Sequence, residues 1–176
     1  MKYKRSVPAK VFAGLFILLI LLFVAIVFIR LSNSEHTSIG TVRILIPASQ
    51  NFKAHMFEVT TDGVLESYIW SNYAPIDFEQ AEKHIEDAKR RTKKLSQNQC
   101  EEINILINDA KKCDPDFRNV MLDGVYICAL LDGNYYESPF FAGTLHDANE
   151  KLRDLTYRLI ELSSLNTPLK DYVSSR

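Results

Sequence analysis

The chain begins with a long apolar run and continues as shorter segments in which apolar and polar residues alternate. Residues 11–29, VFAGLFILLILLFVAIVFI, contain no charged side chain, no amide side chain and no proline. As a helix this run is about 28 Å long, which matches the hydrocarbon thickness of a bilayer. A helix also satisfies every backbone amide in lipid. The run therefore predicts one transmembrane helix over residues 11–29, after a short N-terminus at residues 1–10.

Basic residues flank this run unevenly. Four bases lie within residues 1–10, whereas only Arg30 follows the run directly. Under the positive-inside tendency, the N-terminus stays in the cytoplasm and the rest of the chain is extracytoplasmic. A cleaved signal peptide is the alternative, but its apolar stretch is usually about 7 to 15 residues long. We therefore expect a retained, single-pass signal-anchor in the cell membrane, with lipid around residues 11–29.

Strand patterns follow a polar tether at residues 30–40. Residues 41–48, TVRILIPA, are rich in β-branched side chains, but Pro47 lacks an N–H and limits the segment to an edge strand or a lead-in. Residues 55–70 hold two β-prone runs around Asp62-Gly63, a dipeptide that favours two-residue hairpin loops. With such a loop, period-two alternation predicts one buried face composed of Phe57, Val59, Thr61, Val64, Tyr68 and Trp70.

Two amphipathic helices are predicted next. From Asp77 to Lys94, apolar residues recur every three or four positions, and Asp77 is placed to cap the helix. A second helix starts at a capping box of Ser96 and Gln99 and ends before Pro115. The apolar positions of the first helix are Phe78, Ala81, Ile85, Ala88 and Thr92. Those of the second are Cys100, Ile103, Leu106, Ile107, Ala110 and Cys113.

The C-terminal part repeats the order of hairpin and helix. Residues 120–141 contain two Asp-Gly pairs around the run VYICALL, which predicts a hairpin or a three-stranded meander. A last helix begins near Asp147, and residues 168–176 are expected to form a frayed tail. The apolar positions of that helix are Ala148, Leu152, Leu155, Leu159 and Leu162. The order of elements predicts an α+β fold for an extracytoplasmic domain at residues 41–167, in two layers, with an antiparallel sheet of hairpins and helices on one face.

The distribution of charge narrows the class of partner. The chain has 21 basic and 22 acidic residues. Five of the bases and none of the acids lie in residues 1–30, so the rest of the chain is mildly acidic. Nucleic-acid binding depends on Lys and Arg side chains that neutralise phosphates. We therefore expect no nucleic-acid partner.

Three cysteines raise the question of a disulfide or a thiol nucleophile. Cys100 and Cys113 fall about 20 Å apart along one predicted helix, too far for a disulfide. A bridge between Cys113 and Cys128 stays open, although all three cysteines lie on apolar stripes or strands, as core cysteines do. Cys100 lies in the first turn of its helix, where the dipole lowers a thiol pKa, but no histidine forms a recognisable catalytic pattern with it.

Motifs that bind metals, phosphates or dinucleotides are absent from the sequence. There is no His-Glu-x-x-His, Cys-x-x-Cys or Gly-x-Ser-x-Gly, and no phosphate-binding or dinucleotide-binding glycine pattern. The triplet His84-Ile85-Glu86 matches half of the zinc-deaminase signature, whose Pro-Cys-x-x-Cys half is missing. We therefore expect no cofactor, no metal site and no enzyme activity.

A run of bases at residues 89–94 allows two interpretations. Five bases in a short run can hold an acidic partner or phospholipid headgroups. On a helix, however, Glu86 and Asp87 lie four residues before Arg90 and Arg91 and neutralise part of the run. The sequence favours the second interpretation, a solvated helix end.

Aromatic side chains gather in the predicted hairpins, and Tyr and Trp are enriched at protein interfaces. Most of these rings are expected to pack within the sheet, whereas Tyr135, Tyr136 and Phe141 are the candidate binding residues. An anchor, a compact domain and the lack of catalytic motifs favour a non-enzymatic module of the cell envelope that binds another envelope protein or a peptide. Two alternatives stay open: a membrane-tethered hydrolase with a carboxylate site or with Cys100 as nucleophile, and a structural subunit that assembles through its transmembrane helix.

Overall fold

The computed structural model describes residues 20–24, 39–50, 52–112, 125–140 and 150–174. The chain forms two units, Met1–His36 and Thr37–Arg176. In the first unit, residues 20–24 are helical and all five of their apolar side chains are exposed. Among the described residues there is no helix with the length and apolar character that a membrane span requires. Most of the predicted span at residues 11–29 lies outside the described residues.

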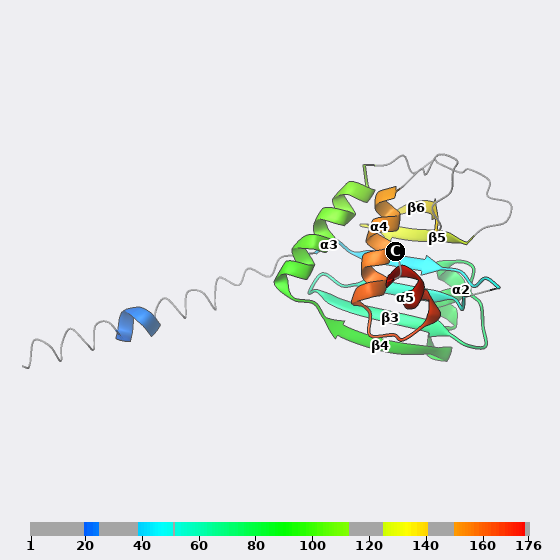
Figure 1. The fold of residues 1–176 in the computed structure, drawn as a ribbon, viewed down its shortest axis with the longest axis horizontal. Coiled ribbons are helices and arrows are strands. Elements are labelled where there is room, and N and C mark those ends of the chain that lie inside the picture. The colour runs from blue at the N-terminus through cyan, green and yellow to red at the C-terminus, as the bar shows by residue number, and fades with distance from the viewer. Residues whose placement is uncertain (1–19, 25–38, 51, 113–124, 141–149, 175–176) are drawn as a thin grey trace, which may run out of the picture. The chain divides into compact units, whose positions relative to one another are not determined.

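In the described part of the second unit, six antiparallel strands form one sheet. The strands are β1 (Val42–Ile46), β2 (His55–Val59), β3 (Val64–Trp70), β4 (Ala88–Lys94), β5 (Tyr126–Leu131) and β6 (Asn134–Pro139). Their order across the sheet is β4-β3-β2-β1-β5-β6, with β4 at the lower edge in Figure 1. The helices and this antiparallel sheet confirm the predicted α+β class.

Three of the described helices cover one side of the sheet, which we call the first face. They are α3 (Gln97–Ala110), α4 (Glu150–Leu162) and α5 (Pro168–Ser174). Strand residues such as Ile44 and Phe57 pack there against helix residues such as Ile107 and Leu159, all nearly inaccessible to solvent. This cluster is the main hydrophobic core, and its burial is the principal stabilising contribution to the fold.

A smaller cluster lies on the opposite side, which we call the second face. Helix α2 (Phe78–Lys83) and the following 3-10 turn (Ile85–Asp87) cover part of it. Ala81 of α2 packs there with Leu45 and Trp70. The prediction of helices on one face is therefore wrong, because the alternation along β1, β2, β3 and β5 leaves apolar side chains on both faces, and α2 covers those on the second.

Capping side chains fix where two helices begin. Asp77 accepts a hydrogen bond from the backbone N–H of Gln80 at 2.8 Å and starts α2. Ser96 and Gln99 form the full capping box at the start of α3, as predicted. Each cap satisfies N–H groups that have no partner within the helix.

The β2–β3 hairpin exists as predicted, but with a longer loop. Gly63 donates to the carbonyl of Thr60 at 2.9 Å and has a φ of 75°, so that Thr61, Asp62 and Gly63 form a three-residue loop. Val59 therefore pairs with Leu65, one residue out of the predicted register. A one-residue change moves a strand's side chains to the other face. Phe57 and Val59 face the main core, whereas Tyr68 and Trp70 lie on the second face.

The β5–β6 hairpin matches its prediction. Asp132 and Gly133 both have positive φ, 48° and 81°, as a two-residue type I′ loop requires. Leu131 pairs directly with Asn134 across this loop. The other predicted turn, Asp123-Gly124, lies outside the described residues, as do the expected starting cap Asp147 and the break at Pro115.

The predicted helix from Asp77 to Lys94 is wrong over its second half. It ends at Lys83, and Ala88–Lys94 forms strand β4 beside β3. The indole N–H of Trp70 donates to the carbonyl of His84 at 2.8 Å. This hydrogen bond satisfies a carbonyl group at the end of α2. On a continued helix, bases four residues apart, such as Arg90 and Lys94, would repel one another. A strand separates these charges onto two faces.

Two further predictions need correction. β1 is not an edge strand, because it pairs with β2 on one side and β5 on the other. The strand ends at Ile46, so the missing N–H of Pro47 is not needed for pairing. Residues 168–174 of the predicted tail are not frayed, since they form α5, in which Leu169 and Val173 are buried in the main core.

Candidate interaction site

The free edge of β4 presents unpaired backbone groups. Leu95 donates its N–H to the carbonyl of Gly63 at 3.0 Å, and hydrogen-bonded pairs alternate along an antiparallel ladder. The residues of β4 that bond to β3 are therefore Lys89, Arg91 and Lys93. The N–H and C=O groups of Arg90, Thr92 and Lys94 point away from the sheet, and no partner for them is found among the described residues.

The same strand is the most basic element in the described part of the chain. Five of its seven residues are Lys or Arg and none is acidic. All seven residues are exposed or half-buried, and Thr92 is the one uncharged residue between the cations. An edge strand that carries cations resists pairing with a copy of itself.

Arg90 has its charge compensated on the second face. Its guanidinium pairs with the carboxylate of Glu66 and lies over the ring of Tyr68, 5.8 Å from the centroid. Burial would raise the pKa of Glu66, but hydrogen bonds from Tyr68 and Arg90 outweigh it and lower that pKa. Burial and the bond to Glu66 raise the pKa of Tyr68 to about 12. The charges of Arg90 and Glu66 therefore compensate each other, and the hydroxyl of Tyr68 is hydrogen-bonded to Glu66.

The cations on the first face are less fully compensated. Lys89, Arg91 and Lys93 share this face, since they lie at alternate positions of β4. Lys93 donates through its Nζ to the carbonyl of Leu162 at the end of α4, 3.1 Å away. Within the described ranges, Lys89 and Arg91 have no acidic partner. The helix-based pairing of Arg90 with Glu86 and of Arg91 with Asp87 does not form, because the segment is a strand.

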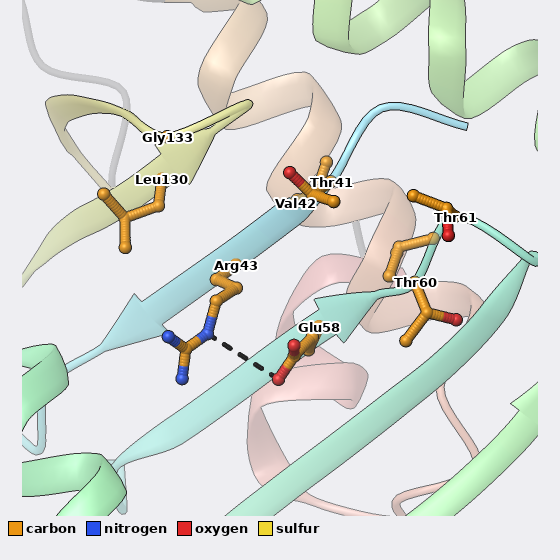
Figure 2. A pocket seen from close by; sticks show the side chains of 9 residues that line it. Thr41, Val42, Arg43, Glu58, Thr60, Thr61, Leu130 and Gly133 are labelled. Atoms are coloured by element: carbon orange, nitrogen blue, oxygen red, sulfur yellow. Dashed lines mark ion pairs between the residues drawn. The ribbon is translucent and has the colours of Figure 1, made fainter. Parts of the chain in front are cut away.

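A second feature of the sheet is a hollow of about 360 Å³ over β1, β2 and β5. Figure 2 shows Arg43 and Glu58, which both line the hollow, pointing toward one another, with Nε and Oε2 3.6 Å apart. Arg43 also donates through Nη1 to Glu82 of α2 at 2.5 Å and lies over the ring of Phe78. The charged side chains that line the hollow are therefore engaged with each other and with α2. The lining is Thr41, Val42, Arg43, Glu58, Val59, Thr60, Thr61, Leu130 and Gly133.

The predicted binding aromatics do not share one surface. Tyr135 is 45 % exposed at the outer strand β6, whereas Tyr136 is 6 % exposed and belongs to the main core. Phe141 lies outside the described residues. Neighbouring residues of a strand point to opposite faces, so Tyr135 and Tyr136 cannot contact one flat partner together.

The described thiols are not placed as nucleophiles. Cys100 and Cys128 are buried free cysteines, and Cys113 lies outside the described residues. Burial raises the pKa of the Cys100 thiol despite its place in the first turn of α3. Burial also raises the pKa of Cys128 to about 11. An activated thiol needs the opposite shift, toward a stable thiolate.

A signal for the β4 edge was present in the sequence as the basic run at residues 89–94, but the helix interpretation concealed it. The described residues also hold no cluster of His, Cys, Asp and Glu side chains that would bind a metal ion. The open basic edge is thus the surface with the clearest binding chemistry in the described part of the chain.

No protein-family model, curated protein or solved structure matches this chain.

Proposed function

We propose that this protein is a non-enzymatic interaction module of the cell envelope, held in the membrane by residues 11–29, whose folded domain binds another protein or a peptide. The observation that carries the proposal is the edge of β4, where the outward backbone groups of Arg90, Thr92 and Lys94 have no partner in the described part of the chain. An exposed sheet edge is a template on which an extended segment adds as a further strand. The buried thiols and the engaged charges of Arg43 and Glu58 favour binding over catalysis.

The membrane anchor is supported by the first unit taken by itself. Residues 20–24 are helical, and their side chains, Ile20, Leu21, Leu22, Phe23 and Val24, are 49 to 70 % exposed. Such a continuous apolar surface is stable in lipid and unfavourable in water. A reporter enzyme active only outside the cytoplasm, fused to the C-terminus, should be active, and the intact chain should sediment with membranes. A cytosolic intact chain would contradict this orientation.

Site-specific photo-crosslinking in intact cells tests the interaction. A benzophenone amino acid at Thr92 keeps all five cations of β4 and lies beside the open edge. The matched control is the same amino acid at Ile105, which is 62 % exposed on α3. We expect a discrete crosslinked species from position 92 and not from position 105. Identical products from both positions, or none from position 92, would contradict the proposal.

A further inference from the structure

The geometry of β4 points to the class of partner, and this inference rests on the proposed function: we infer that the edge takes an extended acidic segment with carboxylates at alternate positions. The segment would add as a seventh strand, next to β4. Two properties of the edge act together: outward backbone groups and cations that both lack partners within the described ranges. Each property specifies a different part of the partner.

Backbone pairing specifies an extended conformation. The N–H and C=O groups of Arg90 and Thr92 point outward, whereas those of Arg91 between them bond to β3. An added strand would meet the outward groups at every second residue, which is the spacing that a strand provides. A helix or a folded loop presents its own backbone groups already paired and cannot use this row.

Side-chain charge specifies alternate acids. Lys89 and Arg91 project from the same face and are exposed, with no acidic partner among the described residues. Arg90, on the other face, is already paired with Glu66. Residues opposite each other on adjacent strands lie within reach of ion pairing. Carboxylates are therefore favoured opposite Lys89 and Arg91, at positions two residues apart, and give no comparable gain opposite Arg90.

Other occupants fit the edge less well. A second copy of β4 would place like charges opposite one another, which is unfavourable. The opposite edge strand of a second copy, β6, also fits β4 less well. It carries Glu137, but it ends in Pro139, which has no N–H to donate to β4. A phospholipid surface could bind the cations, but it would leave the backbone groups of Arg90 and Thr92 without partners.

Binding of short synthetic peptides to the full chain in zwitterionic detergent tests the inference. The probe is an extended peptide of the length of β4 in which Glu and Thr alternate. One control peptide has the same composition with its acids clustered in one half. A second carries N-methyl groups on the backbone amides that would face β4, which removes the strand pairing and keeps the charge.

The matched protein variants separate charge from fold. Lys89→Gln with Arg91→Gln should weaken the affinity for the alternating peptide by roughly fivefold, because two cross-strand ion pairs are lost. The control, Lys83→Gln with Lys112→Gln, removes two exposed cations elsewhere and should leave binding unchanged. Thr92→Pro removes an outward N–H and should abolish binding, with a thermal midpoint that shows the sheet intact.

The outcomes are distinct. Binding of the alternating peptide alone, weakened by the β4 variants and not by the control variant, supports the inference. Equal binding of the clustered or N-methylated peptide would show a general polyanion effect and overturn strand addition. Binding of anionic phosphatidylglycerol vesicles without peptide binding, or self-association of the chain, would overturn the acidic segment as occupant. If every peptide fails while position 92 still crosslinks to a partner, the inference fails and the proposed function stands.

Discussion

Gly63 in the β2–β3 loop lies directly against Cys100 in the first turn of α3. A Cβ built on Gly63 would be 2.9 Å from the Cys100 Sγ, closer than side chains approach in proteins. The carbonyl of Gly63 also accepts a hydrogen bond from Leu95 at 3.0 Å, at the end of β4. This contact links the hairpin, β4 and α3 at one point, and it explains why the loop residue is a glycine both for its φ of 75° and for space.

Replacing this glycine should destabilise the fold through two separable effects. Gly63→Ala is expected to cost about 2 to 4 kcal/mol, from the left-handed backbone and from the clash with Cys100. Gly133→Ala is the matched control, because Gly133 has a φ of 81° and nothing within 4 Å of its Cβ position. It should cost only about 1 kcal/mol.

A double-mutant cycle isolates the clash. Cys100→Ala removes the sulfur, so Gly63→Ala should cost less in that background than in the natural chain, by about 1 kcal/mol or more. Denaturant unfolding of the four proteins gives the coupling energy. Equal costs in both backgrounds would contradict the packing described at this contact.

His55 should make the fold sensitive to mild acid. Desolvation lowers its pKa from 6.5 to about 4. Its Nδ1 donates to the carbonyl of Lys53 at 2.7 Å, while the buried Nε2 has no hydrogen-bond partner among the described residues. Because the folded pKa lies below the unfolded one, the unfolded chain binds the proton first. Stability therefore falls as the pH drops from about 6.5 to about 4, by about 2 to 4 kcal/mol from this group.

The variant His55→Gln tests this pH dependence, because it removes the titrating ring and keeps an amide donor. Its free energy of unfolding should change less than that of the natural chain between about pH 7 and about pH 4.5. Glu66 and Asp109, whose pKa values are lowered, titrate in both proteins and cancel in the comparison. The same slope in the two proteins would show that His55 is not the buried neutral group described.

Proline substitutions in β4 should separate its inner and outer backbone groups. Arg91→Pro removes an N–H that bonds to β3 and should cost about 3 kcal/mol or more. Thr92→Pro removes an outward N–H and should cost about 1 kcal/mol or less, since proline is tolerated on that side of an edge strand. Thermal or denaturant unfolding measures both. A larger loss from Thr92→Pro would mean that its N–H is paired in the folded chain.

The buried thiols should resist modification. In a Cys113→Ser background, Cys128 should react with a disulfide reagent roughly 100-fold more slowly than in the unfolded chain at about pH 8, because little thiolate forms at its raised pKa. Cys100→Ser should leave partner crosslinking from position 92 intact. A thiol that reacts faster in the folded chain, or loss of function in Cys100→Ser, would favour the thiol hydrolase instead.

The sequence was sufficient where local chemistry determines structure. Ser96 and Gln99 predicted the start of α3, and Asp132-Gly133 predicted a two-residue turn, because in both cases the hydrogen bonds or φ values belong to a few adjacent residues. The α+β class followed from the order of such segments. The α4 stripe was predicted as well, since Leu155 and Leu159 are buried at helical spacing.

The sequence was insufficient where a contact between residues far apart in the chain determines the local structure. The β2–β3 loop favours a two-residue turn locally, but the third loop residue places Phe57 and Trp70 on opposite faces, where separate clusters bury them. Residues 88–94 have helical spacing, yet pairing with β3 makes them a strand. The candidate site was missed for this second reason, because a basic helix end and a basic sheet edge have the same composition and different backbone partners.

Amide hydrogen exchange along β4, resolved to single residues in the full chain, distinguishes an open sheet edge from a covered one. We expect slow exchange at Lys89, Arg91 and Lys93, whose N–H groups bond to β3, and fast exchange at the outward amides of Arg90, Thr92 and Lys94. The alternating acidic peptide should then slow exchange at these outward amides and leave the other three unchanged. Equal protection at all six amides without peptide would show that the edge is already covered and would contradict an open edge.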